Sequence, residues 1–273
     1  MTTSLRLILE YDGTPFIGWQ HNPQGVSIQS VVESALATWL RCKDRVAVTA
    51  AGRTDAGVHA KAQVASFTLP QGAGVDPADA DALRRMHRGL NGLLPPEVAV
   101  RQVAVMPEGF QALRCASGKW YRYHLLNRPE KSPLMDAWTW HHPRVLDAAV
   151  LDRLARPIVG EHDFAGFRGS KCNARTTVRR IDQVTVTRQE DGLLTIDFHG
   201  NGFLKHMVRG LVGTLLDMAN GRLPETTIAT VLARGDRREA GMNVPAKGLC
   251  LMRVYYPPPF DTPLAFAGED GPF

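Results

Sequence analysis

The spacing of hydrophobic positions divides the first third of the chain into short strands and helices. Apolar and polar residues alternate over residues 4–10, S-L-R-L-I-L-E, which is typical of a β-strand with one buried face. Apolar residues recur at helical spacing from Ile28 to Leu40. Asp79 can cap a second helix, which the Pro95-Pro96 pair ends. Further strands are predicted over 46–51, 63–69 and 98–105.

The rest of the chain nearly repeats this order of elements, although not the sequence itself. The pattern predicts strands over 119–126, 177–187, 193–199 and 249–255, and helices over 146–155, 204–219 and 225–234. Helices that do not alternate strictly with strands favour an α+β fold with mostly antiparallel sheets. We therefore expect two similar α/β halves, 1–108 and 109–257, followed by an extended tail over 258–273.

Composition narrows the class of protein. The 273 residues are 44% hydrophobic and 22% charged, as in an ordinary globular protein, and the net charge of +5 hints weakly at a polyanionic partner. No signal peptide and no run of about 20 apolar residues is seen, so we expect a cytoplasmic protein without a membrane partner. The four cysteines are isolated, which suggests neither a metal site nor disulfides.

Basic residues gather in two places. One cluster, opposed only by Asp182, consists of Arg168, Lys171, Arg175, Arg179, Arg180 and Arg188. The other consists of Arg84, Arg85, His87 and Arg88 on the predicted helix. Either cluster alone could be a solvated face, but together they favour contacts with phosphate groups.

The segment A-A-G-R-T-D-A-G-V-H-A, residues 50–60, carries the leading candidate for chemistry. Asp55 follows a predicted strand and stands between Gly52 and Gly57. Read locally, this is an ordinary Asx-turn. Arg53 favours a site instead, because a cation beside the carboxylate can grip a phosphodiester and keep Asp55 ionised as a nucleophile or base.

Two other segments carry candidate contacts. In G-K-W-Y-R-Y-H-L-L, residues 118–126, Tyr121 could pack in the core or stack on a nucleobase. In F-L-K-H-M-V-R, Lys205 and Arg209 are four residues apart, so we expect them on one face of the first turns of a helix. Cations are disfavoured there by the helix dipole, which indicates an anion nearby.

These motifs together resemble the tRNA pseudouridine synthase A family. The resemblance rests on G-R-T-D-A-G-V-H at 52–59, E-Y-D-G-T-P-F-I-G-W-Q near the start, L-N-G-L-L-P at 90–95, K-W-Y-R-Y at 119–123, G-E-H-D-F-A-G-F-R at 160–168 and F-L-K-H-M-V-R at 203–209. It implies a pseudouridine synthase fold, in which the two sheets join across a central basic cleft. It also implies a homodimer that isomerises uridine to pseudouridine at positions 38 to 40 of the tRNA anticodon stem-loop, by base flipping and without metal or organic cofactor.

The resemblance also assigns roles. Asp55 takes the position of the catalytic aspartate, acting at the sugar or base as a nucleophile, or as the base that removes the C2′ proton. Arg53, Tyr121 and Arg209 take substrate-binding positions. RNA contacts are expected from Lys205, His206, Arg168 and Arg175.

One segment departs from the family pattern. Residues 110–113 read F-Q-A-L where the family tends to have F-H-A-R, and the arginine comes one place later, at Arg114. Either Arg114 supplies the charge from a shifted position or that RNA contact is lost.

Two other functions compete with this assignment. L-I-L-E-Y-D-G-T resembles the aspartyl-phosphate motif of haloacid-dehalogenase-like phosphatases, but Glu10 stands in the place of the nucleophile. The stronger alternative is a non-catalytic RNA-binding module. A carboxylate such as Asp55 argues against it, since repulsion penalises an acid in a phosphate-binding cleft.

Overall fold

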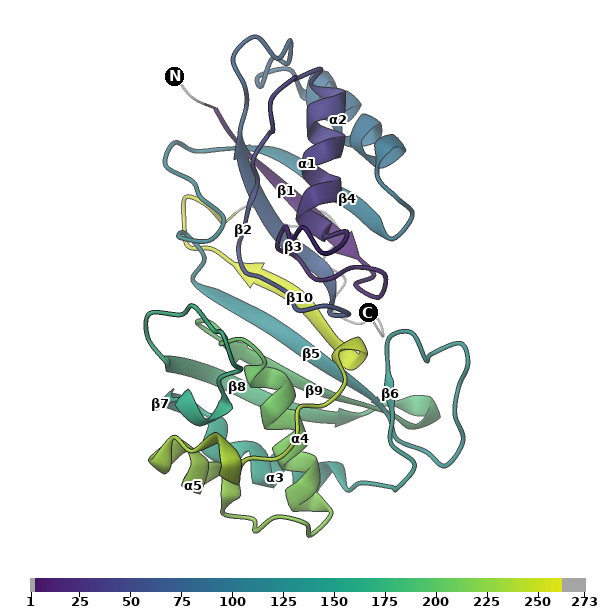
Figure 1. Cartoon of the computed structure of the whole chain (residues 1–273), viewed down its shortest axis with the longest axis vertical. Helices are drawn as coiled ribbons and strands as arrows, with labels where there is room; N and C mark the ends of the chain where they lie inside the picture. Colours follow the sequence, from purple (N-terminus) through teal and green to yellow (C-terminus); the bar gives the residue numbers. More distant parts are fainter. Residues whose placement is uncertain (1–2, 262–273) are drawn as a thin grey trace. The chain divides into compact units, whose positions relative to one another are not determined.

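The computed structural model describes residues 3–261, and the chain forms two compact units (Figure 1). The first comprises residues 3–117 and 251–261, and the second is Gly118–Cys250. These bounds differ from the predicted ranges 1–108 and 109–257, because the last strand, β10 (Leu249–Tyr255), carries the chain back to the first unit. Of the predicted tail, residues 262–273 lie outside the described part.

The sheet of the first unit is antiparallel around β1 (Ser4–Tyr11). This strand pairs with β3 (His59–Thr68) on one side and β4 (Val98–Met106) on the other, and β10 follows β3 in the strand order. The predicted strand over 46–51 is shortened to β2 (Thr49–Ala50), which pairs with β3. Val48 is buried but bonds to helix side chains instead: its N–H donates to Glu33 at 3.0 Å and its carbonyl accepts from Gln29 at 3.1 Å.

Two helices accompany this sheet, as the sequence predicts. The first, α1 (Ile28–Trp39), begins with a capping box between Ser27 and Ser30. The second, α2 (Ala80–Leu93), is capped by Asp79, whose carboxylate accepts from the Asp81 N–H at 2.8 Å. α2 packs against β4 and α1, which buries Met86 and Leu90.

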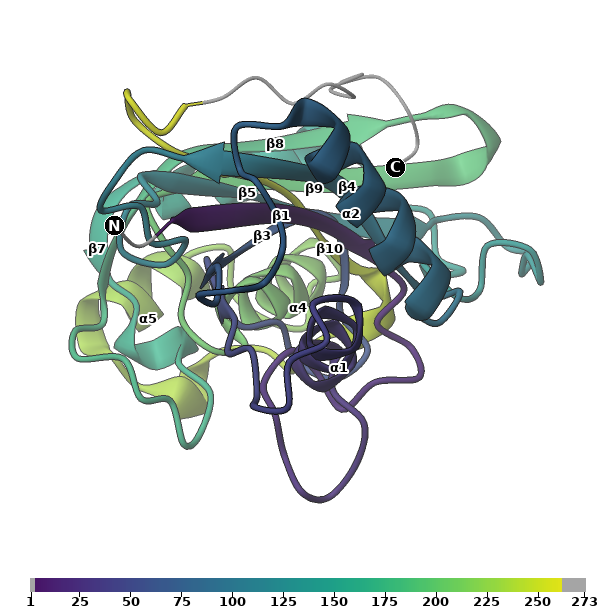
Figure 2. The same ribbon diagram turned by 90° about the horizontal axis from the view of Figure 1, so that it is seen from above.

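The second unit also has an antiparallel sheet, in the order β5 (Gly118–Leu126), β9 (Leu193–Gly200), β8 (Val178–Arg188) and β7 (Gly160–Asp163). Its helices are α3 (Ala148–Ala155), α4 (Met207–Ala219) and α5 (Thr227–Arg234), and Figure 2 shows α4 and α5 on one face of the strands. The sequence missed β6 (Trp140–His141), which pairs with β5, and β7, because both are too short to show a period. Short 3-10 turns occupy Arg156–Ile158, Ala165–Phe167, Glu190–Gly192, Arg237–Glu239 and Ala246–Gly248.

The start of α4 corrects one prediction. The helix begins at Met207 and not at residue 204, because His206 adopts a left-handed backbone conformation with φ of 63°. Lys205 therefore lies in the preceding loop, and the expectation that it shares a helical face with Arg209 is wrong. The dipole argument built on that placement does not apply to Lys205.

Both units thus confirm the α+β class with mostly antiparallel strands. Within residues 3–261, no helix is both long and apolar enough to cross a membrane.

Candidate active site

Asp55 lies on a tight turn between β2 and β3. The Val58 N–H donates to the Asp55 carbonyl at 3.1 Å, and Gly57 has a φ of 75°, a conformation that glycine adopts without strain. Asp55 is half-buried and Arg53 is exposed. A carboxylate with restricted access to water and an exposed guanidinium therefore stand two residues apart.

The segment after β1 supports this turn through two glycines. A Cβ on Gly13 would lie 2.1 Å from the Val58 carbonyl oxygen, and a Cβ on Gly18 would lie 2.8 Å from that of Thr54. The two backbones touch directly at both positions. Hydrogen bonds join them as well: the Trp19 N–H donates to the Thr54 carbonyl at 3.0 Å. The turn is thus fixed from one side by main chain alone.

A buried chain of hydrogen bonds fixes the turn from the other side. The hydroxyls of Tyr11 and Thr54 are 2.8 Å apart. The side-chain amide of Gln63, which is fully buried, donates to the Gly52 carbonyl at 2.9 Å and to the Tyr11 hydroxyl at 3.4 Å. The two residues on either side of Arg53 are therefore anchored to the sheet, Gly52 to β3 and Thr54 to β1.

In the second unit, Tyr121 lies on β5 and is 7% exposed. The edge of its ring meets the ring of Phe203 in a T-shaped contact with centroids 5.1 Å apart. Phe203 belongs to the loop between β9 and α4, and no pattern in the sequence indicated its contact with Tyr121. Such a pair can hold one face of an inserted base.

The same loop contains Lys205 and His206 and contacts residues 169–170, so three of the predicted RNA-binding residues lie close together. The Gly169 N–H donates to the Lys205 carbonyl at 2.8 Å, and Lys205 Nζ donates to the Ser170 carbonyl at 3.2 Å. A Cβ on Gly169 would lie 2.6 Å from His206 Nδ1, so the ring of His206 covers this glycine. Arg168, next to it in sequence, and Lys205 are exposed.

Arg209 lies in the first turn of α4 and is half-buried. Its Nε donates to the Val244 carbonyl at 2.8 Å, which orients the guanidinium through one donor. Arg175 is exposed in the loop before β8, and no described contact links it to Lys205 or His206. The structure therefore gathers Tyr121, Arg209 and three of the four predicted RNA-binding residues around the segment 201–209, and it places Asp55 and Arg53 on the other unit.

Similarity to characterised proteins decides the family. Residues 154–257 match the model of a tRNA pseudouridine synthase family. The tRNA pseudouridine synthase A of Syntrophotalea carbinolica is 46% identical over 93% of this chain and 96% of its own length, and that of Geobacter sulfurreducens is 44% identical over 93% and 99%. The chain belongs to the tRNA pseudouridine synthase A family. An H/ACA ribonucleoprotein structure bound to a substrate RNA with 2′-deoxyuridine aligns with 90% of this chain and 47% of its own, at 12% identity and a TM-score of 0.36.

The segment that departs from the family pattern is well anchored. The Ala112 N–H donates to Ser66 Oγ at 3.0 Å, and the Ala112 carbonyl accepts from the Tyr256 hydroxyl at 2.8 Å. These bonds leave Leu113 53% exposed and Arg114 exposed beside it. An arginine at either position would reach solvent, so a shifted charge at Arg114 is compatible with this loop.

The acidic residues of the motif that resembles the phosphatases, Glu10 and Asp12, bind neighbouring residues of the chain and so have structural roles. Glu10 pairs with Arg101 at 2.9 Å, and Asp12 accepts from the backbone and hydroxyl of Thr14 at 2.9 and 2.6 Å. Asp12 thus closes a turn that presents Gly13 to the Asp55 loop. Among the described residues, no group of three His, Cys, Asp or Glu side chains is placed to hold a metal ion.

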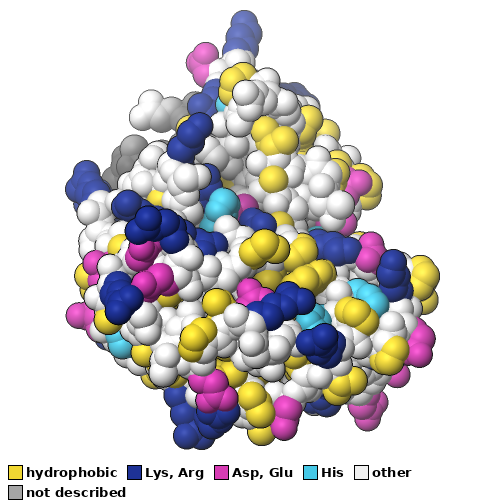
Figure 3. Space-filling model, turned by 60° about the horizontal axis from the view of Figure 1, so that its bottom comes forward, with side chains coloured by type: hydrophobic (Ala, Val, Ile, Leu, Met, Phe, Trp, Pro, Cys, Tyr) yellow, Lys and Arg dark blue, Asp and Glu magenta, His cyan; other side chains and the backbone are white. Residues whose placement is uncertain are grey.

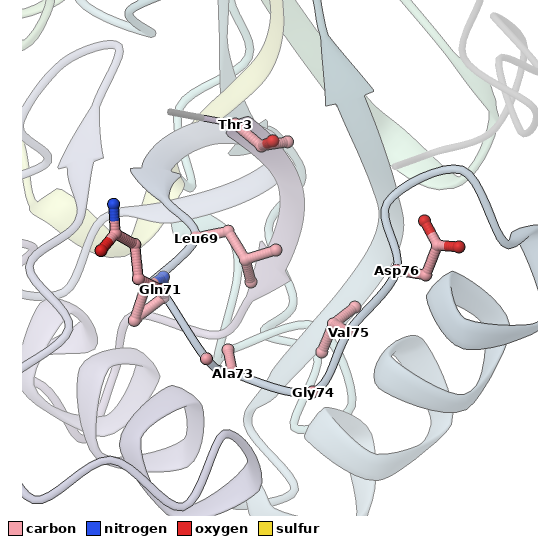
Figure 4. Close-up of a pocket in the computed structure, with 9 residues that line it drawn as sticks. Thr3, Leu69, Gln71, Ala73, Gly74, Val75 and Asp76 are labelled. Atoms are coloured by element: carbon pink, nitrogen blue, oxygen red, sulfur yellow. The ribbon is translucent and has the colours of Figure 1, made fainter. Parts of the chain in front are cut away.

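One pocket lies far from Asp55, at the other end of β3. It has a volume of about 470 Å³ and is lined by Thr3 and the loop from Leu69 to Asp76 (Figure 4). This loop follows the end of β3, whereas Asp55 precedes its start, and a strand of 10 residues spans about 30 Å. The pocket also lacks a basic residue, so it does not suit RNA. On the face drawn in Figure 3, Lys and Arg side chains lie among acidic ones and form no continuous stripe.

Proposed function

We propose that this chain isomerises uridine to pseudouridine at positions 38 to 40 of the tRNA anticodon stem-loop, with Asp55 as the catalytic carboxylate. The supporting observation is the Asp55 turn. Its backbone is fixed by glycine contacts on one side and by the Gln63 network on the other. A carboxylate held this way loses little conformational entropy when the substrate binds. The entropy of orienting the reacting groups is therefore already spent before the reaction, which lowers the barrier.

The reaction breaks the N1–C1′ bond, rotates the detached uracil and joins C5 to C1′. C5 loses its proton and N1 gains one, so the product is an isomer of the substrate. Asp55 acts as the nucleophile, or removes the C2′ proton in the route through a glycal. Tyr121 stacks on the flipped base, while Arg53 and Arg209 balance the phosphate and the charge that develops. These side chains can carry out all the reaction steps without an external nucleophile. We therefore propose that neither a metal nor an organic cofactor takes part.

The basic side chains at the loop before α4, together with exposed Arg175 in the loop before β8, fit contacts to the stem-loop. We assign this role to Lys205, His206, Arg168 and Arg175. We further propose a cytoplasmic homodimer. Light scattering coupled to size exclusion tests the oligomer: a mass near 30.0 kDa, that of one chain, would exclude it.

Tritium release tests the catalytic proposal. Wild-type protein is incubated with tRNA transcripts that carry tritium at uridine C5, and free tritium is counted. Asp55→Asn removes the charge at nearly constant shape, so release should stop while tRNA affinity stays within about threefold. Asp44→Asn is the matched control, since Asp44 is an exposed carboxylate of the same unit and its loss should change neither quantity.

The outcomes separate the competing functions. If wild type binds tRNA but releases no tritium, the chain is a non-catalytic RNA-binding module. If Asp55→Asn loses most of its affinity, Asp55 is an RNA contact and not the catalytic group.

A further inference from the structure

Lys119 and Arg179 point to the same side of the second unit as Tyr121. Lys119 precedes Tyr121 by two residues on β5, and side chains alternate between the faces of a strand. In the ladder, Lys119 pairs with Gly200 of β9, and Gly200 pairs with Ile181 of β8. Ile181 is fully buried on the face that carries the core, and Arg179 lies two residues before it.

Two glycines let neighbouring groups pack closely along this row. A Cβ on Gly200 would lie 2.6 Å from the Arg180 carbonyl oxygen and 2.8 Å from the Ile181 side chain, so these groups fill the place of the missing side chain. A Cβ on Gly202 would lie 3.4 Å from Arg179 Nε. The Arg179 side chain therefore lies beside Gly202, one residue before Phe203, whose ring contacts Tyr121.

Neither cation has an acidic partner within residues 3–261. The only side-chain hydrogen bonds of Arg179 run from Nη1 to the carbonyls of Thr176 and Val178, at 3.0 and 2.6 Å, which leaves Nε and Nη2 as donors. The next residue in the strand differs: Arg180 Nε pairs with Asp182 at 2.8 Å.

The positive charges of Lys119 and Arg179 also repel each other. Burial, and then the charge of Arg179, lower the pKa of Lys119 to about 8. Burial lowers the pKa of Arg179 as well. Holding two unneutralised cations together costs free energy, and a bound anion would offset this cost.

We propose that Lys119 and Arg179 form a phosphate-binding subsite that holds a backbone phosphate of the RNA beside the nucleotide at Tyr121. Two residues of strand span about 6.6 Å, so one nucleotide can contact Tyr121 with its base while the adjacent phosphate reaches Lys119. Arg179 can use its free Nε and Nη2 as a fork toward two phosphate oxygens. This subsite rests on the proposed function for its ligand, but its geometry does not depend on Asp55.

The salt dependence of binding tests the subsite. The affinity for a tRNA anticodon stem-loop transcript is measured at several salt concentrations for wild type, Lys119→Met, Arg179→Met and the double variant. Each single change should weaken binding by about 5- to 30-fold and lower the salt slope by about 1. Arg180→Met is the control from the same strand and should leave the slope unchanged, because its charge is already paired. Arg179→Lys keeps the charge and should restore most of the slope.

The outcomes are distinct from those of the proposed function. If Lys119→Met and Arg179→Met unfold at or above the wild-type temperature and bind with the wild-type slope, the subsite is wrong even if tritium release is normal. If wild type releases no tritium while both changes lower the slope, the subsite stands and the catalytic proposal fails. A variant whose melting temperature falls is judged by the Arg179→Lys comparison, and equal slopes for Arg179→Lys and Arg179→Met would overturn the proposal.

Discussion

The substitution Gly13→Ala adds one methyl group and should strongly lower kcat, although it changes none of the proposed catalytic residues. The Cβ of Gly13→Ala would start 2.1 Å from the Val58 carbonyl oxygen and 2.6 Å from its carbon. Both are backbone atoms, so no side chain can rotate away. The separation must grow to at least 3.0 Å, a shift of about 1 Å that falls on the turn carrying Asp55.

The expected magnitude follows from this displacement. A misplacement of about 1 Å can lower a rate by about 10²-fold, and overpacking of this kind costs about 1–3 kcal/mol of stability. We therefore expect kcat for tritium release to fall by about 10²-fold, with a smaller effect on tRNA affinity. Gly13 has a negative φ, so the effect comes from the contact and not from backbone strain.

Gly92→Ala is the matched control. Gly92 lies in α2 with open space where the Cβ would be, and alanine is favoured over glycine in a helix by about 1 kcal/mol. Its kcat should equal that of wild type. Tritium release is measured at a temperature where circular dichroism shows each variant to be folded. A folded Gly13→Ala protein with wild-type kcat would refute the idea that this contact positions Asp55.

Three further changes test the local physics of each unit. Tyr11→Phe removes the hydrogen bond to Thr54 and should lower the free energy of unfolding by about 1–2 kcal/mol and reduce kcat more than it raises KM; an equal change in both would contradict a positioning role. Asp197→Asn leaves the buried Arg122 guanidinium without its carboxylate and should cost about 3–5 kcal/mol in urea unfolding, whereas a loss below 1 kcal/mol would mean that water reaches the pair. Lys119→Met should raise the stability of the free protein by about 1–2 kcal/mol at pH 7, because the Lys119 ammonium group holds its proton less tightly in the folded state than in the unfolded state. This gain should disappear as the pH rises from about 8 to 10.5, and a gain that stays constant over this range would refute the lowered pKa.

The periodicity of the sequence was sufficient for the longer elements. β1, α1, α2, β4 and β5 begin and end within about two residues of their predicted bounds, because each buries one face and the burial leaves a regular pattern. The family motifs likewise pointed to Asp55, Arg53, Tyr121 and Arg209 before any geometry was known. Local signals of this kind depend only on residues that are close in the chain.

Contacts between distant residues decided the rest. The strand over 46–51 is cut to two residues because Gln29 and Glu33 bond to Val48 in place of a neighbouring strand. Lys205 lies outside α4 because the chain turns at His206, whose ring covers Gly169. Neither event leaves a trace in the local sequence.

The sequence by itself thus predicted which residues would carry the chemistry, and it determined most of the longer segments of regular structure. Only the tertiary structure decided how they are held: Gly13 against Val58, Gln63 beneath Gly52, and Lys119 in the same row as Arg179. The physical reason is that these relations depend on strand register and on the close approach of backbones far apart in sequence. A glycine in the sequence does not say which atom fills the place of its missing side chain.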